Sequence, residues 1–203
     1  DPVACVDLVS ERCAWSLMGN HDFGALYEPT NFNSAAELAA YWTRDQLEME
    51  EDEQAAARRW NVLGSLRVRT TLNEFLCVHG SPRRPINEYI FPDDAINSPV
   101  KMKQIFDQVP KYCLVGHTHV PGVFTDEPEF YGPEDMDNAT WKLNDEERCI
   151  INPGSVGQPR DLDPRASYAI LNEEARTVEF FRLPYDIDSV VDKIYAIPKL
   201  SNW

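Results

Sequence analysis

Short apolar runs alternate along this chain with longer segments in which apolar residues recur every three or four positions. The first pattern predicts buried strands, and the second predicts helices. The predicted helices span residues 2–11, 34–47, 50–63, 100–109 and 187–197. The predicted strands span residues 14–18, 66–71, 75–78, 112–115, 140–143, 149–151, 167–171 and 177–183. We find no internal repeat, and 203 residues fit one domain with a sizeable core.

The ends of two predicted helices carry residues typical of helix caps. Asp1 followed by Pro2 predicts a helix that opens with an N-cap carboxylate. Asn33 or Ser34 is expected to cap the second helix. Residues 124–147 are rich in Pro, Asp, Glu and Gly, so we expect a long loop there that contains one of the predicted strands as an edge.

All four histidines lie in three short segments that contain glycine. The segments read Gly-Asn-His-Asp at residues 19–22, Val-His-Gly-Ser-Pro at 78–82 and Gly-His-Thr-His at 116–119. Each segment directly follows a predicted strand, so Asn20 and His21, for example, are expected in the loop after residues 14–18. The carboxyl ends of strands are where α/β proteins bind ligands. Asn and neutral His supply oxygen and nitrogen donors, and Gly lets the backbone turn sharply beside them. The pattern therefore predicts that the three segments converge on one metal cluster.

The charge of the chain limits its partners. It has 19 basic and 34 acidic residues and a formal net charge of −15. Such a chain lacks the positive surface needed for nonspecific binding to nucleic acid or to an anionic membrane. The sequence EMEEDE at residues 48–53 is interpreted as a solvated helix face or loop. No run approaches the roughly 18 apolar residues of a membrane span.

The cysteines indicate a reducing compartment. There are five, an odd number, and no two have the C-x-x-C spacing. Cys77 and Cys113 lie in apolar runs, where a small thiol packs well. Together with the lack of a signal peptide at the start of the sequence, this pattern predicts reduced thiols in a cytoplasmic protein.

The three histidine segments, in this order, resemble the later motifs of the calcineurin-like metallophosphoesterase superfamily, which read GNH[DE], xHG and GHxH. Further segments are similar to a bacterial branch often labelled diadenosine-tetraphosphatase-like or YfcE-like phosphodiesterases. The resemblance extends from residue 1 to the last predicted helix. These further segments are WTRDQL at residues 42–47, HGSPR at 79–83, YIFP at 89–92 and NPGSVGQPRD at 152–161.

The resemblance implies an α/β fold, a four-layer α/β/β/α sandwich with two mixed sheets, formed as a single domain over residues 1–203. The superfamily begins with the motifs DxHG and GDxxD or GDxxG, and this chain contains neither. Residues 1–6 look like the segment that follows the second motif. We therefore expect the fold to be incomplete at its amino end, without the first β-α-β portion.

The resemblance also assigns roles to the histidine segments. In the superfamily two divalent metals hold a hydroxide that attacks phosphorus in line. By motif, Asn20, His79 and His117 would bind the second metal, and His119 would reach the first. His21 would lie beside the leaving-group oxygen and donate a proton or a hydrogen bond to it. Manganese is the expected metal, with iron, zinc, nickel or magnesium as alternatives.

Several of these residues have a simpler interpretation. Asn20 could cap a turn or helix, and Asp22 is interpreted as a cap or an orienting partner rather than a ligand. Arg83 and Arg160 could each clamp a phosphate or pair with a surface carboxylate. Arg160 is favoured because a Gly/Ser turn precedes it. Three aromatic residues are expected in the core rather than in a base-stacking platform, namely Tyr89, Phe91 and Tyr185.

The missing motifs would remove the bridging carboxylate and leave His119 as the first metal's only ligand. Neutral ligands alone hold a hard divalent ion weakly, so we expect at most one metal and little activity from this polypeptide alone. An incomplete sheet would also favour a partner or a homo-oligomer.

The sequence thus predicts a metal-dependent phosphoester hydrolase, a phosphodiesterase or dinucleoside-polyphosphate hydrolase that acts on a small phosphoester or nucleotide. A serine/threonine phosphatase is the alternative within the same chemistry. A non-catalytic interaction or regulatory module with the same fold is the alternative from another class.

Overall fold

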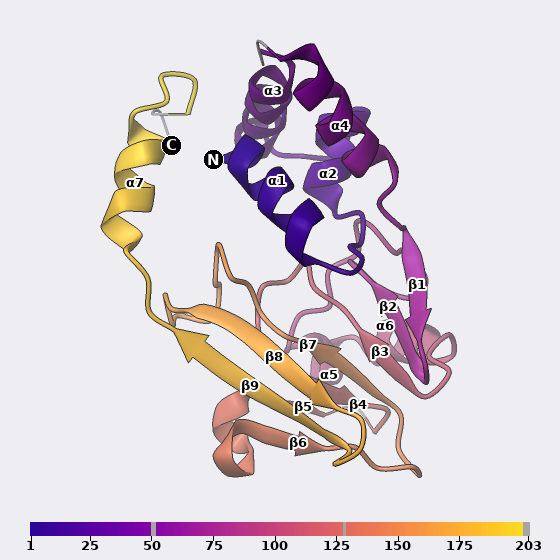
Figure 1. Cartoon of the computed structure of the whole chain (residues 1–203). Coiled ribbons are helices and arrows are strands. Elements are labelled where there is room, and N and C mark those ends of the chain that lie inside the picture. Colours follow the sequence, from indigo (N-terminus) through magenta and orange to yellow (C-terminus); the bar gives the residue numbers. More distant parts are fainter. Residues whose placement is uncertain (50–51, 128, 201–203) are drawn as a thin grey trace. The chain divides into compact units, whose positions relative to one another are not determined.

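The computed structural model describes residues 1–49, 52–127 and 129–200 (Figure 1). The chain divides into two compact units. The first comprises Asp1–Val68 and Asp186–Trp203, and the second comprises Arg69–Tyr185. In the described ranges, no helix combines the length and the apolar character needed to cross a bilayer.

The first unit is helical. The Asn33 side chain accepts a hydrogen bond from the backbone N–H of Ala36 at 2.8 Å, which confirms Asn33 as a cap. The predicted helix 50–63 begins at Glu53, and residues 50 and 51 lie outside the described residues. Asp1 occupies the N-cap position of the first helix, but its carboxylate bonds to Lys193 at 2.6 Å instead of capping the backbone. The helices are α1 (Pro2–Arg12), α2 (Asn20–Leu26), α3 (Ser34–Glu48), α4 (Glu53–Gly64) and α7 (Ile187–Tyr195).

Two predictions for the first unit are wrong. The expected strand at residues 14–18 is only a single β-bridge between Leu17 and Arg67. The residues after Gly19, expected in a loop, begin helix α2. The cause is a local cap, because the Asp22 carboxylate accepts a hydrogen bond from the N–H of Gly19 at 2.8 Å and so stabilises the first turn.

The second unit contains two sheets, which confirms the predicted α/β fold with two sheets, although only the larger sheet is mixed as predicted. The larger is mixed, and its strands lie in the order β1-β2-β3-β7-β4-β5. The smaller has the order β6-β9-β8, and its strand pairs are antiparallel. The strands are β1 (Arg69–Leu72), β2 (Phe75–Val78), β3 (Tyr112–Leu114), β4 (Gly122–Thr125), β5 (Phe130–Tyr131), β6 (Thr140–Lys142), β7 (Cys149–Asn152), β8 (Ala166–Asn172) and β9 (Thr177–Leu183).

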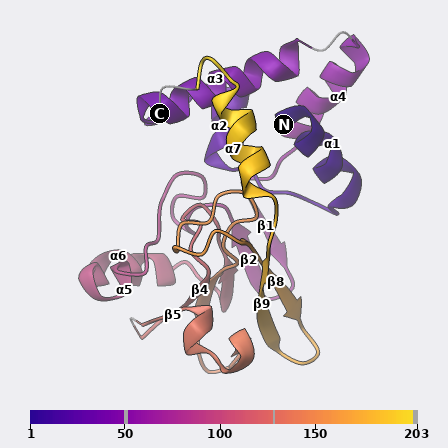
Figure 2. The same cartoon turned by 90° about the vertical axis from the view of Figure 1, so that its left-hand side faces the viewer.

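Helices α5 (Asp94–Asn97) and α6 (Pro99–Phe106) lie next to each other in both Figure 1 and Figure 2. Alternate residues of the central strands pack with α6 in one apolar core, whose members include Leu76, Cys113, Ile150, Met102 and Ile105. The intervening strand residues point to the opposite face and are buried as well, except Leu114, which is half-buried. Burial on both faces explains why the central strands read as continuous apolar runs in the sequence.

The long segment 124–147 is more regular than a loop. Strand β4 starts before it and pairs with β7, and a two-residue strand β5 follows. Two short 3-10 helices, Pro133–Asp135 and Asp137–Ala139, lead to β6. Strand β6 is the outermost strand of the smaller sheet, as predicted for an edge strand.

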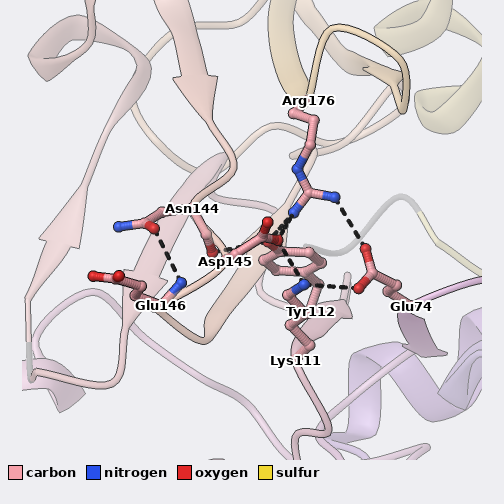
Figure 3. Close-up of polar contacts among 7 residues, drawn as sticks. All are labelled: Glu74, Lys111, Tyr112, Asn144, Asp145, Glu146 and Arg176. Carbon is pink, nitrogen blue, oxygen red and sulfur yellow. Dashed lines mark hydrogen bonds and ion pairs between the residues drawn. The ribbon is translucent and has the colours of Figure 1, made fainter.

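A polar network joins the two sheets of the second unit (Figure 3). Lys111, beside β3, bonds to Glu74 at 2.7 Å and to Asp145 at 2.6 Å. Arg176, in the β8–β9 turn, bonds to Glu74 at 3.0 Å and donates to the Tyr112 hydroxyl oxygen at 2.6 Å. Because Arg176 belongs to the smaller sheet and Glu74 and Tyr112 to the larger, the network ties the ends of both sheets together.

We expect Arg176→Ala to lower the melting temperature at neutral pH and not at strongly acidic pH. Hydrogen bonds from Lys111 and Arg176 hold the pKa of Glu74 below its ordinary value of 4.5. The bond from Lys111 likewise holds the pKa of Asp145 below 3.8. A lowered carboxyl pKa stabilises the fold above the unfolded-state value, and this contribution is lost as the pH falls through the folded-state pKa. Circular dichroism melts across this range test the expectation. Lys103→Ala, which removes an ion pair within one helix, is the control. Equal effects of both changes would contradict the joining role.

Candidate metal centre

Two of the three histidine segments leave neighbouring parallel strands at the same edge of the larger sheet. Strand β2 ends at Val78, directly before His79, and β3 ends two residues before Gly116. The two strands are parallel, with Cys77 opposite Leu114. The Gly116 N–H donates to the His79 carbonyl at 2.8 Å, so the two turns are bonded to each other.

His79 and His117 form a pair of ring nitrogens. His79 Nε2 and His117 Nδ1 lie 3.2 Å apart. Two ligands bound to one ion at about 2.1 Å lie roughly 3.0–3.4 Å apart, so this separation fits a shared divalent ion. His117 is buried and His79 is half-buried, which limits competition from water. Neutral imidazoles suit zinc, iron, nickel and copper ions.

The Gly116–His119 turn holds its histidines in an unusual backbone conformation. His117 and His119 have φ values of 60° and 62°, in the left-handed region. Such residues cost on the order of 1–2 kcal/mol each and persist where the surroundings hold them. Thr118 is buried between them, and its hydroxyl donates to the Ile90 carbonyl at 3.0 Å. The turn is therefore anchored to the segment that follows His79.

His119 is oriented by a bond to the backbone. Its Nδ1 lies 2.7 Å from the carbonyl oxygen of Gln158. A carbonyl oxygen only accepts, so Nδ1 carries the proton and Nε2 keeps its lone pair. Metal-binding histidines commonly show this arrangement, in which the outer nitrogen donates to a carbonyl. His119 is thus prepared to bind a metal through Nε2.

Asn152 holds the histidine turn in place, a role the sequence interpretation missed. It is 1% exposed, donates to the Gly116 carbonyl at 2.8 Å and accepts from the Gly154 N–H at 2.9 Å. Gly154 has a φ of 84°, and a Cβ there would lie 2.6 Å from the Ser167 hydroxyl oxygen, so only glycine fits. Asn152 is the last residue of β7, which is parallel to β3. The expectation that functional residues lie at the carboxyl ends of strands could therefore have identified it.

The two candidate arginines differ in their surroundings. Arg83 bonds to both oxygens of Glu88 and to Gln104. Burial opposes ionisation of Glu88, but its bonds with Arg83 and Ser81 leave its pKa lowered. Arg160 is exposed and bonds only to Gln158 through its side chain among the described contacts, at 2.7 Å. Its backbone N–H donates to the carbonyl of His119 at 3.2 Å, which places Arg160 beside the Gly116–His119 turn.

Asn20 and His21 lie in the first unit, whereas the other three histidines lie in the second. Asn20 is the first residue of α2, and Gly19 takes the N-cap position. The hydrogen bond from Gly19 to Asp22 confirms the interpretation of Asp22 as a cap. The exposed ring of His21 packs against Phe32 with centroids 4.9 Å apart. That Asn20 shares an ion with His79 and His117 stays a prediction.

An aromatic pair lies against the metal centre. The Tyr89 ring stacks on His117 with centroids 3.8 Å apart, and on Phe91 with centroids 5.1 Å apart. Phe91 is 49% exposed, so its assignment to the core is wrong. Tyr89 and Tyr185 are half-buried. The contact between Tyr89 and His117 depends on the fold of the loop after β2, and no local pattern marks it.

The donor set of the second unit is a histidine pair with a third histidine beside it. Among the described residues, no group of three or more His, Cys, Asp or Glu side chains is placed around one point. The separation within the pair is compatible with one shared ion.

Comparisons with known proteins show the family of this chain and support its fold. The sequence model of the calcineurin-like phosphoesterase superfamily domain matches residues 7–176. An uncharacterized protein of Methanocaldococcus jannaschii, MJ0912, is 31% identical over 213 residues, covering all of this chain and 78% of that protein. The crystal structure of a metallophosphoesterase from Sphaerobacter thermophilus matches with a TM-score of 0.76 and 35% identity, over 95% of this chain and 76% of that one. Hypothetical protein PH1004 from Pyrococcus horikoshii OT3 matches with a TM-score of 0.64 at 15% identity, over 96% and 72% of the two chains, and this supports the fold alone.

Proposed function

This chain belongs to the calcineurin-like phosphoesterase superfamily, and we propose that it hydrolyses a small phosphodiester or a dinucleoside polyphosphate. Members of this superfamily are metal-dependent phosphoester hydrolases. The observation that carries the proposal is the pair of ring nitrogens of His79 and His117, 3.2 Å apart at the carboxyl ends of adjacent parallel strands. We propose manganese as the metal, with iron, zinc, nickel or magnesium as alternatives.

The residues of this chain would divide the work. A bound divalent ion would polarise a phosphoryl oxygen as a Lewis acid. His79 and His117 would hold it, and the bond from His119 to Gln158 would fix the orientation of the third imidazole. The guanidinium of Arg160 can bind two phosphate oxygens at once and so orient the substrate. His21 would supply a proton to the leaving group.

The test is hydrolysis by chain stripped of metal and then titrated with manganese. The substrates are bis(para-nitrophenyl) phosphate, para-nitrophenyl phosphate, diadenosine tetraphosphate and a phosphoserine peptide. We expect the activity of this polypeptide alone to be low, to require added metal and to favour the diester or the dinucleotide over the monoester. Preference for the phosphopeptide would support a protein phosphatase instead. Metal binding without hydrolysis of any substrate would support a non-catalytic module.

We expect Arg160→Ala to lower kcat/KM by about tenfold to a hundredfold, because a bidentate contact to phosphate is lost. Arg160→Lys should lose less activity than Arg160→Ala, because lysine keeps the positive charge but cannot bind two phosphate oxygens in the bidentate way of a guanidinium group. Steady-state kinetics measure both effects.

Arg83→Ala is the matched comparison. It should lower the free energy of unfolding by about 1–3 kcal/mol, because the Glu88 carboxylate, 9% exposed, loses its charged partner. Its effect on kcat/KM should be smaller than that of Arg160→Ala. The reverse order would assign the phosphate contact to Arg83.

A further inference from the structure

A groove of about 690 Å³ opens in the second unit, away from the histidines of the metal centre. Its lining includes Tyr131 from β5 and Trp141 from β6. Strand β5 is the outermost strand of the larger sheet and β6 is the outermost strand of the smaller one. The groove therefore lies where both sheets end, and its volume is within the range of pockets that hold ligands.

One wall of the groove is aromatic. The rings of Tyr131 and Trp141 have centroids 5.2 Å apart and an interplanar angle of 40°. Both residues are half-buried, so each keeps part of its surface accessible. Aromatic faces carry negative potential and attract ammonium and guanidinium groups within about 6 Å.

The ionisable residues of the groove are mainly acidic. Between residues 126 and 147 the chain has nine acidic residues and one basic residue, Lys142, a net charge of −8. Asp135, Asp137 and Glu147 line the groove itself, as does Lys142, so its lining carries three carboxylates and one ammonium group. Burial, together with the charges of neighbouring carboxylates in the same segment, raises the pKa of Glu147.

We propose that this groove binds an extended segment of a partner protein that carries lysine or arginine side chains. The cationic groups would lie against the faces of Tyr131 and Trp141 and pair with Asp137 and Glu147. An extended backbone also suits the site, because the outer edge of a sheet can pair with an added strand. A second copy of this chain does not fit as the partner, because its own net charge of −15 would repel the acidic groove.

The test measures the affinity of the full chain for a short capped peptide of alternating lysine and valine, by isothermal titration calorimetry. The groove variant is Asp137→Asn with Glu147→Gln. The control variant is Glu173→Gln with Glu174→Gln, which removes the same charge from the exposed β8–β9 turn. We expect the groove variant to bind about fivefold to tenfold more weakly than the wild type, and the control to bind as the wild type does. A peptide with acetylated lysines should not bind.

Equal weakening in both variants would overturn the proposal, because it would indicate general attraction to an acidic surface. Spermidine binding as tightly as the peptide would also overturn it and indicate a site for a free polyamine. If the groove variant fails to fold, the NMR signal of the Trp141 indole N–H in the wild-type chain is followed as peptide is added. A shift on adding peptide supports the groove, and an unchanged resonance rejects it.

Discussion

Replacing His117 with asparagine should reduce metal affinity and phosphoester hydrolysis by about a hundredfold or more. His117 is 4% exposed, and its Nδ1 lies 3.2 Å from His79 Nε2. Its ring also stacks on Tyr89, so a water molecule has little room to take its place. Asparagine is the informative substitution because it tolerates the left-handed backbone of this position, with a φ of 60°. The loss would then report the missing imidazole rather than a strained turn.

Metal content and kcat/KM should be measured together for this variant. His21→Ala is the matched comparison, because His21 is predicted to act on the leaving group and not on the metal. It should keep the metal and lose turnover. If His117→Asn retained metal and activity at wild-type levels, the histidine pair would not be the metal site, and the proposed function would lose its main support.

Asn152→Leu should lower the free energy of unfolding by about 2–4 kcal/mol and weaken metal binding by about tenfold. The side chain is 1% exposed, so water cannot replace its bonds to Gly116 and Gly154. Leucine has nearly the same size but cannot form either bond. The half-buried Gly154 N–H would lose its bond to Asn152, and the Gly116 carbonyl would keep only the bond from the Thr118 N–H. The Gly116 turn would lose an anchor, and the position of His117 would become less defined.

Urea unfolding and metal titration check this expectation. Asn152→Asp separates the two bonds, since it can still accept from Gly154 but has no N–H for Gly116. Asn172→Ala, which removes an exposed turn bond to Ala175, should cost about 0.5–1 kcal/mol and leave metal binding unchanged. An Asn152→Leu variant as stable as the wild type, with unchanged metal affinity, would show that the turn holds its shape without this side chain.

Elements with a strong local pattern were predictable. Strands β2, β3 and β7 appeared as short apolar runs, because both faces of the central sheet are largely covered and nearly every position is then apolar, with Asn152 at the end of β7 as the exception. Helix α3 appeared through its apolar spacing and the Asn33 cap. Strand β4 was missed because it begins at Gly122, whose Cβ position is occupied by the Phe130 ring, a contact that no local pattern shows.

Within the site, the sequence by itself determined which residues can bind a metal. Histidines and asparagine after apolar strands are a local pattern, and donor chemistry depends only on residue type. The tertiary structure decided which of them meet. The 3.2 Å approach of His79 and His117 joins residues 38 positions apart, and it requires β2 and β3 to pair in parallel. Packing also decided three further contacts, which sequence spacing does not encode. They are the bond of Arg83 to Glu88, the bond of Asn152 to the Gly116 carbonyl and the stacking of Tyr89 on His117.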